Sequence, residues 1–190
     1  MVDYILLPDT ARTTVRERLA REHKYFYHFT LDQHASSIKQ FGLDPRFEGD
    51  DSSYPNRDRE PSKAIRYCTE QNLALGLSAA STRQTVWDPS AEMHVPGPAR
   101  IILLRTPANC LLEKPFGLDH SFSDAARSAE QILQTRPSLS ADEFHDIVTR
   151  FGAVSCYAVI PPTELEICIG DVAAFCHSHT GEFSPLLQHG

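Results

Sequence analysis

The sequence predicts an α+β domain, because helix-like and strand-like segments alternate in the first part of the chain, whereas strand-like segments cluster near its end. The length of 190 residues suits one domain with its own core. The fractions of hydrophobic residues (41%) and charged residues (23%) are ordinary for a globular protein. We therefore expect a single domain over residues 1–190, with a core at about residues 24–176 and an N-terminal helix at residues 10–22.

The first third of the chain has a clear order of elements. Apolar residues recur four positions apart between charges in residues 10–22, which predicts an amphipathic helix. Residues 24–30 (KYFYHFT) are rich in aromatics and predict a strand. A helix is predicted at residues 31–41, ended by Gly42. Residues 44–62 are dense in Asp, Arg, Pro and Ser and predict a long polar loop.

Short apolar runs and helical periodicity predict the strands and helices of the rest of the chain. Ser140 followed by Glu143 is the signature of a capping box at the start of a helix. Residues 82–98 form a second polar stretch, and we expect the tail from His177 onward to be irregular. The predicted strands are residues 64–68, 100–106, 154–160 and 165–170, and the predicted helices are residues 70–81, 120–134 and 140–151.

Charge and cysteine content limit the classes of protein. The net charge of −7 disfavours broad binding to a nucleic-acid backbone, which needs a basic face. Five cysteines without paired spacing indicate a reduced compartment. No apolar run approaches the roughly 20 residues that span a bilayer, and no secretory signal is visible, so no membrane partner is expected. We expect a cytoplasmic protein, or one delivered into a target cell without a cleaved signal peptide.

Three short segments contain residues suited to chemistry. The first is YHFT (residues 27–30), followed by a helix and then Phe-Gly-Leu at residues 41–43. The second is RYCT (residues 66–69), which leads into an alanine-rich helix. The third is PPTELE (residues 161–166), which opens an apolar strand with two carboxylates two positions apart. On a strand, that spacing places both side chains on one face.

In this order the segments resemble those of ADP-ribosyltransferases of the diphtheria-toxin and poly(ADP-ribose) polymerase type. In that family one strand ends in Tyr-His-Gly-Thr, a second ends in Tyr-Ser-Thr before a helix, and a glutamate opens a later strand, with a Glu-x-Glu spacing in arginine-modifying members. The resemblance implies a split mixed or antiparallel β-sheet core with surrounding helices. It also implies an enzyme that uses NAD as co-substrate, splits it at the nicotinamide bond and transfers ADP-ribose to an acceptor.

The resemblance assigns roles to particular residues. His28 would hydrogen-bond a ribose hydroxyl, and Phe29, with Thr30 beside it, would offer backbone groups to the carboxamide if the phenyl ring points away. Tyr67 would lie beside the nicotinamide. Glu166 would be the catalytic glutamate and Glu164 the residue that serves the acceptor. Arg46 is a candidate partner for the phosphates, and Arg57, Arg59 and Arg66 are equally open choices.

The chemistry supports such a set on its own terms. Breaking the N-glycosidic bond of NAD⁺ builds positive charge on the ribose, as in glycoside hydrolysis. A nearby carboxylate stabilises that charge in the transition state. An aromatic ring stacks on the leaving nicotinamide, and a histidine on a rigid strand gives a directional hydrogen bond. One histidine, one aromatic residue and one glutamate are therefore sufficient.

Structural explanations remain open for the same residues. His28 and Tyr67 also suit ordinary half-buried and core positions of strands, and the two glutamates suit the solvent face of an edge strand. The spacing of Cys176, His177 and His179 matches no common zinc site, so no metal is expected.

Alternative functions also remain. Phe29 in place of the family's glycine, and the absence of a second aromatic near Leu77 and Ser78, favour a degenerate module that binds a nucleotide or a protein without catalysis. An RNA 2′-phosphotransferase is a further alternative, which would need a basic cleft. The Glu-x-Glu spacing suggests a protein arginine as acceptor, and the acidic net charge disfavours a bulk nucleic-acid acceptor. Small molecules and nucleotide ends stay open as acceptors. Oligomeric state and biological role (toxin, effector, defence factor or housekeeping modifier) stay open.

Overall fold

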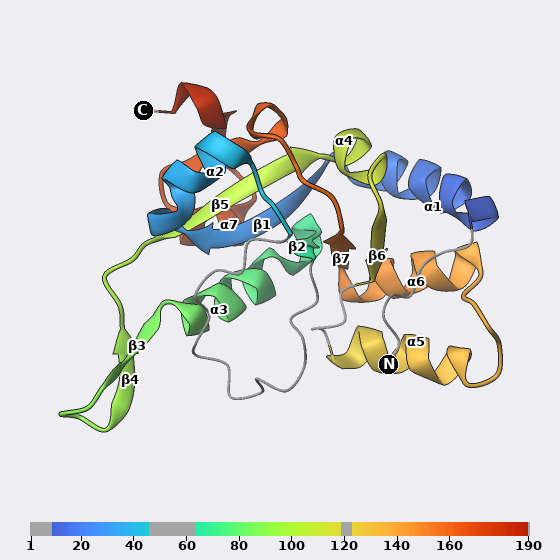
Figure 1. Ribbon diagram of the computed structural model, residues 1–190, viewed down its shortest axis with the longest axis horizontal. Coiled ribbons are helices and arrows are strands. Elements are labelled where there is room, and N and C mark those ends of the chain that lie inside the picture. Colours follow the sequence, from blue (N-terminus) through green and yellow to red (C-terminus); the bar gives the residue numbers. More distant parts are fainter. Residues whose placement is uncertain (1–8, 46–63, 119–122, 190) are drawn as a thin grey trace.

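The protein is a mixed α+β structure built on one large antiparallel sheet (Figure 1). The computed structural model describes residues 9–45, 64–118 and 123–189. Seven strands form the sheet in the order β6-β7-β2-β1-β5-β8-β9, and every pairing between described strands is antiparallel. The predicted α+β class and the antiparallel character of the sheet are therefore confirmed.

The elements follow the chain in an order that keeps most sheet neighbours far apart in sequence. The strands of the large sheet are β1 (Tyr25–Leu31), β2 (Ile65–Cys68), β5 (Ile101–Pro107), β6 (Phe116–Leu118), β7 (Ala153–Cys156), β8 (Glu166–Ile169) and β9 (Glu182–Pro185), and β3 (Thr85–Asp88) and β4 (Met93–Pro96) form a separate ribbon. The helices are α1 (Asp9–Glu22), α2 (Ala35–Phe41), α3 (Leu73–Arg83), α4 (Ala108–Leu112), α5 (Ser123–Leu133), α6 (Ala141–Phe151) and α7 (Val172–Ser178), with short 3₁₀ turns η1 (Asp32–His34), η2 (Glu70–Asn72), η3 (Pro162–Glu164) and η4 (Leu186–Gln188).

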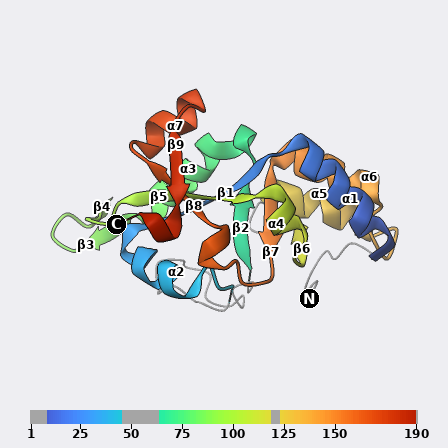
Figure 2. The same cartoon turned by 90° about the horizontal axis from the view of Figure 1, so that it is seen from above.

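Helices lie on both sides of the strands β1, β5 and β8. Figure 2 shows α2 on one side and α3 with α7 on the other. Because side chains alternate along a strand, β1 contributes to two separate cores. Phe26 belongs to the core on the α2 side, together with Ile38 of that helix. Tyr27 and Phe29 belong to the core on the α3 and α7 side, together with Phe175 of α7.

Helices α1, α5 and α6 gather beside the β6 and β7 end of the sheet (Figure 1). Helix α6 begins with the predicted capping box, in which Ser140 and Glu143 exchange side-chain and backbone hydrogen bonds. It buries Phe144 against Phe116 of β6, with 6.0 Å between the ring centroids. None of the helices in the described residues is long and apolar enough to cross a membrane.

Several sequence expectations are wrong in detail. The tail after His177 is not irregular, since β9 pairs with β8 and extends the sheet. Residues 82–98, described from the sequence only as a polar stretch, contain the hairpin of β3 and β4. The strand expected at residues 154–160 ends at Cys156. Helix α4 and strand β6 were not expected at all. These elements are only three to five residues long, so they carry too little periodicity to be recognised.

Candidate functional site

The large sheet opens between β1 and β2. Strand β1 pairs with β5 along its whole length, but its register with β2 consists of the single pair Tyr27↔Cys68. No further pair joins the two strands in the described part of the chain, so they separate beyond this point. We call the opening between Phe29 of β1 and Arg66 of β2, the next positions in the register, the β1–β2 fork.

The backbone of Phe29 faces this fork. The amide of Asp32 donates to the carbonyl of Arg100, and the amide of Ala108 donates to the carbonyl of Lys24. Even-numbered residues of β1 therefore direct their backbone groups toward β5. Because these directions alternate along an antiparallel strand, Phe29 directs its N–H and C=O toward the fork. A strand edge of this kind can bind a ligand through main-chain hydrogen bonds.

The imidazole of His28 bridges the two strands at the fork. Its Nδ1 lies 2.8 Å from the backbone oxygen of Arg66, a residue 38 positions later in the chain. A carbonyl oxygen only accepts, so Nδ1 carries the proton and donates it. In the neutral ring, Nε2 is then the acceptor nitrogen, which suits a hydroxyl donor. The structure thus fixes the orientation of the histidine that the sequence selected.

Tyr67 lies next to His28, but it is a core residue. The two ring centroids are 5.7 Å apart. The Tyr67 side chain is 2% exposed, and its hydroxyl lies 3.2 Å from Oγ1 of Thr106. Burial raises the pKa of Tyr67 well above its usual value, against the opposite effect of the Thr106 hydrogen bond. A ring this deeply buried supports His28 from behind and offers little face for stacking on a nicotinamide.

The side chain of Phe29 points away from His28, into the core beneath α3. Helix α3 accommodates it with a glycine: a Cβ at Gly76 would lie 2.5 Å from Cε2 of Phe29 and 3.2 Å from Sγ of Cys68. Phe29 and Cys68 stand on the two strands that separate at the fork. The condition under which Phe29 can replace a glycine, that its ring points away, is therefore met.

This contact predicts that Gly76→Ala is destabilising, by about 1–3 kcal/mol, because the added methyl overpacks the interface behind the fork. Intrinsic helix propensity alone would favour alanine by about 1 kcal/mol. Urea denaturation of both proteins measures the difference. Ser78→Ala, at an exposed position of the same helix, is the matched control and should change stability by less than about 0.5 kcal/mol. A Gly76→Ala protein more stable than the wild type would contradict the packing argument.

Glu166 does not share a face of the sheet with His28. His28 pairs with Leu104, and Leu104 pairs with Ile167. Glu166 belongs to the next residue pair along β5 and β8, in which it lies opposite Arg105. Residues paired across antiparallel strands lie on one face, and successive residues lie on opposite faces. The cleft expected between the His28 and Glu166 strands is therefore not formed by these two side chains.

A compact ionic and aromatic cluster holds Glu166 on the other face. Its Oε2 accepts from Nε of Arg105 at 2.6 Å and lies 2.6 Å from a terminal guanidinium nitrogen. The guanidinium also sits between two rings, with its carbon 3.8 Å from the centroid of Tyr25 and 3.9 Å from that of Phe183. We call these four residues the Arg105 clamp. It ties β1, β5, β8 and β9 together.

Glu164 lies apart from Glu166. It is the last residue of η3, whereas β8 begins at Glu166, so the two carboxylates do not share a strand. Lys114 pairs with Glu164, with Nζ 3.0 Å from Oε2 and 3.2 Å from Oε1. The charge of Glu164 is also the smallest of the contributions to the raised pKa of Tyr67. The predicted Glu-x-Glu face is thus replaced by two separate carboxylate sites.

Other expected features lie elsewhere or outside the described residues. Arg46, Arg57 and Arg59 fall within residues 46–63, outside the described ranges. Thr30 is half-buried on the same side of β1 as His28. No cluster of three potential metal ligands occurs in the part of the chain that the structure describes.

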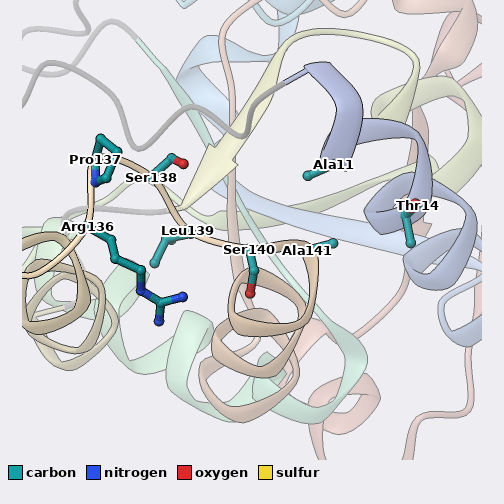
Figure 3. A pocket seen from close by; sticks show the side chains of 8 residues that line it. All are labelled: Ala11, Thr14, Arg136, Pro137, Ser138, Leu139, Ser140 and Ala141. Carbon is teal, nitrogen blue, oxygen red and sulfur yellow. The ribbon is translucent and has the colours of Figure 1, made fainter.

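The surface also has a hollow of about 470 Å³ remote from the fork. Figure 3 shows it between α1 and the turn joining α5 to α6, lined by Arg136, Leu139 and Ala11 among others. Arg136 there pairs with Glu143 of the capping box. None of the candidate catalytic or NAD-binding residues selected from the sequence lines this hollow.

Arg105 and Lys114 are the residues near the predicted site that sequence reasoning missed. Arg105 carries a signal, since it interrupts the apolar run IILLRT (residues 101–106). A charge in such a strand is rarely buried without a partner. Lys114 follows a helix of only five residues and has no comparable signal.

Comparison with known proteins adds no further constraint, because no family model, curated protein or solved structure matches the chain.

Proposed function

We propose that the β1–β2 fork binds NAD⁺ and that the protein is an NAD-dependent ADP-ribosyltransferase. The single observation that carries the proposal is the contact of His28 Nδ1 with the Arg66 carbonyl, next to Tyr67. It brings together the first two sequence segments that resemble this family. The fork also supplies what a carboxamide and a ribose need, which is an oriented backbone edge at Phe29 and an acceptor nitrogen on His28.

The proposed reaction breaks the bond between nicotinamide and the ribose C1′. The bonding electron pair leaves with the nicotinamide nitrogen, and positive charge develops on the sugar. An acceptor nucleophile then bonds to C1′ and loses a proton, or water does so and yields free ADP-ribose. His28 would orient the ribose, Phe29 would hold the carboxamide, and a carboxylate would stabilise the developing charge.

A protein side chain is the proposed acceptor. The net charge of −7 disfavours a nucleic-acid acceptor. The stronger argument for arginine, a Glu-x-Glu pair on one strand face, does not hold, because Glu164 ends η3 and Glu166 begins β8. The choice of side chain therefore has no support from these two glutamates.

A second candidate is a module that binds a nucleotide without cleaving it. It is favoured by a specific observation: the expected catalytic Glu166 is held by Arg105 on the opposite face of the sheet. The burial of Tyr67 points the same way, because it removes the expected stacking platform. Both this module and the enzyme would bind the nucleotide at the β1–β2 fork, but only the enzyme would cleave it.

The first experiment measures NAD⁺ binding by calorimetry and nicotinamide release by chromatography on the purified protein. His28→Ala should weaken NAD⁺ binding about 5- to 30-fold, the loss of one well-oriented hydrogen bond of about 1–2 kcal/mol. His177→Ala, at an exposed position of α7, is the matched control and should bind as the wild type does.

The two candidates give different results in this experiment. Binding with release supports the transferase, and binding without release supports the non-catalytic module. Unchanged binding in a well-folded His28→Ala protein would remove the fork as the site of either activity.

A further inference from the structure

We propose that His23 is a pH-sensitive element at the joint between α1 and β1, and that its protonation below neutral pH loosens the packing of α1 against the rest of the domain. This element acts on the first helix that the structure describes. It is independent of any NAD⁺ binding at the β1–β2 fork.

The imidazole of His23 packs against the core at the point where α1 ends. The His23 amide donates to the carbonyl of Leu19, which closes the last turn of the helix. The ring centroid lies 5.5 Å from that of Phe26, a fully buried residue of β1. The Nε2 atom of His23 is buried, and no hydrogen-bond partner for it lies in the part of the chain that the structure describes. The joint therefore encloses a titratable nitrogen without a polar partner.

This enclosure suits the neutral imidazole and opposes the charged one. A neutral ring can leave Nε2 without a proton, whereas the imidazolium carries an N–H at both nitrogens. Protonation of His23 would place a positive charge and an unpaired donor at a buried site, which costs free energy. In agreement with this, burial is the largest cause of the lowering of the His23 pKa below its usual value of 6.5.

The carboxylates near the joint offset only part of this cost. Glu22 and Glu70 oppose the lowering of the His23 pKa, and the charge of His145 adds to it. Both carboxylates are about half-exposed and contact other histidines. An oxygen of Glu22 lies 2.8 Å from Nε2 of His145, and an oxygen of Glu70 lies 3.3 Å from Nδ1 of His179. Neither carboxylate reaches the enclosed Nε2 of His23.

Helix α1 is held by its apolar face and by polar contacts with α6. Val15 and Leu19 are fully buried in the main core. The helix contacts α6 (Figure 2), where Nη1 of Arg18 lies 2.5 Å from Oδ1 of Asp142. Other charged groups of the joint also have contacts of their own, namely the Lys24 ammonium over the ring of Tyr25 and Asp146 at 3.8 Å from Nδ1 of His145. The described chain continues from α1 only through His23, so the helix can loosen without changing the order of the strands.

Acid therefore acts on the fold through His23 in one direction. The unfolded chain takes up a proton at this side chain near its usual pKa of 6.5, whereas the folded protein resists the proton. The stability that the neutral ring contributes is complete above this pH and is lost as the pH falls through the lowered pKa of the folded protein. The loss should appear first at α1, because this helix ends at the ring that becomes charged.

The experiment follows urea unfolding of the full chain at about pH 7.5 and about pH 5.5, for the wild type and for His23→Gln, which cannot titrate at this position. On acidification the unfolding equilibrium constant should rise more for the wild type than for the variant, by a factor of at least about two and at most about ten. The upper limit is set by the usual histidine pKa of 6.5 in the unfolded chain. His177→Gln, at an exposed position of α7, is the matched control and should keep the pH dependence of the wild type.

A second variant, His23→Phe, keeps an aromatic ring against Phe26 and also cannot titrate. Hydrogen exchange then locates the effect. At the lower pH the amides of α1, corrected for their intrinsic exchange rates, should lose more protection in the wild type than in His23→Phe. A pH dependence of unfolding in the wild type that is no steeper than in both variants would overturn the proposal. So would a loss of protection that spares α1 and appears only in other elements.

Discussion

Replacing Tyr67 with alanine is expected to lower the free energy of unfolding by about 3–5 kcal/mol, the usual cost of removing a large aromatic side chain from a core. Tyr67 is among the largest fully buried side chains of the protein and packs in the main core. It also lies directly behind His28, so the cavity left by the ring would loosen the fork. Urea denaturation followed by circular dichroism measures the change.

Tyr67→Phe separates the ring of this residue from its hydroxyl. The phenylalanine keeps the packing and loses only the contact with Thr106, at a cost of about 1 kcal/mol. Because the ring still supports His28, NAD⁺ binding should stay within about twofold of the wild type. A loss of binding beyond tenfold in a stable Tyr67→Phe protein would show that the hydroxyl itself contacts the ligand. A cost below about 1 kcal/mol for Tyr67→Ala would contradict the assigned core role.

Replacing Arg105 with alanine is expected to lower the free energy of unfolding by about 2–3 kcal/mol. The change leaves the carboxylate of Glu166 without its cation and removes the group between the rings of Tyr25 and Phe183. This loss of stability is smaller than that expected for a fully buried ion pair, because the side chains of Arg105 and Glu166 are 19% and 29% exposed. The midpoint of urea unfolding measures it.

A double-mutant cycle tests whether the loss comes from the unpaired charge. Arg105→Met keeps an apolar side chain between the two rings but leaves the carboxylate of Glu166 without a cation, so it should be clearly destabilising. Adding Glu166→Gln removes that charge and should recover part of the stability. If the effects of the two changes on the free energy of unfolding are simply additive, Glu166 and Arg105 are not energetically coupled, and the Arg105 clamp does not stabilise the fold through this pair.

The capping box and two strands of the sheet follow from local sequence. Ser140 and Glu143 alone specify the start of α6, because both groups of the box lie within one turn. The strands β1 and β5 were predicted within one residue of their bounds, since each is seven residues long and opens with a run of aromatic or aliphatic side chains. By contrast, β9 has four residues of mixed character and becomes a strand only because β8 provides an edge to pair with.

The candidate site also has features that the sequence predicted and features that only the tertiary structure showed. The sequence selected His28 and Tyr67 by their motifs, and the structure brings their rings together. His28 also contacts the carbonyl of Arg66, which lies 38 residues later in the chain. It also selected Glu164 and Glu166 as a pair on one strand. That expectation failed because the strand begins two residues later than the period-two pattern requires.

By itself the sequence determined the class of fold, the long strands, the capped helix and the residue types available for chemistry. Those features depend on periodicity and on contacts within a turn, which neighbouring residues fix. Only the tertiary structure decided which element each glutamate belongs to and which charge it meets. Arg105 and Lys114 are 61 and 50 residues away from their partners, so no local pattern encodes these pairs. Because β8 begins at Glu166, Glu164 lies outside the strand in the turn η3, and the two carboxylates meet different partners, Arg105 and Lys114.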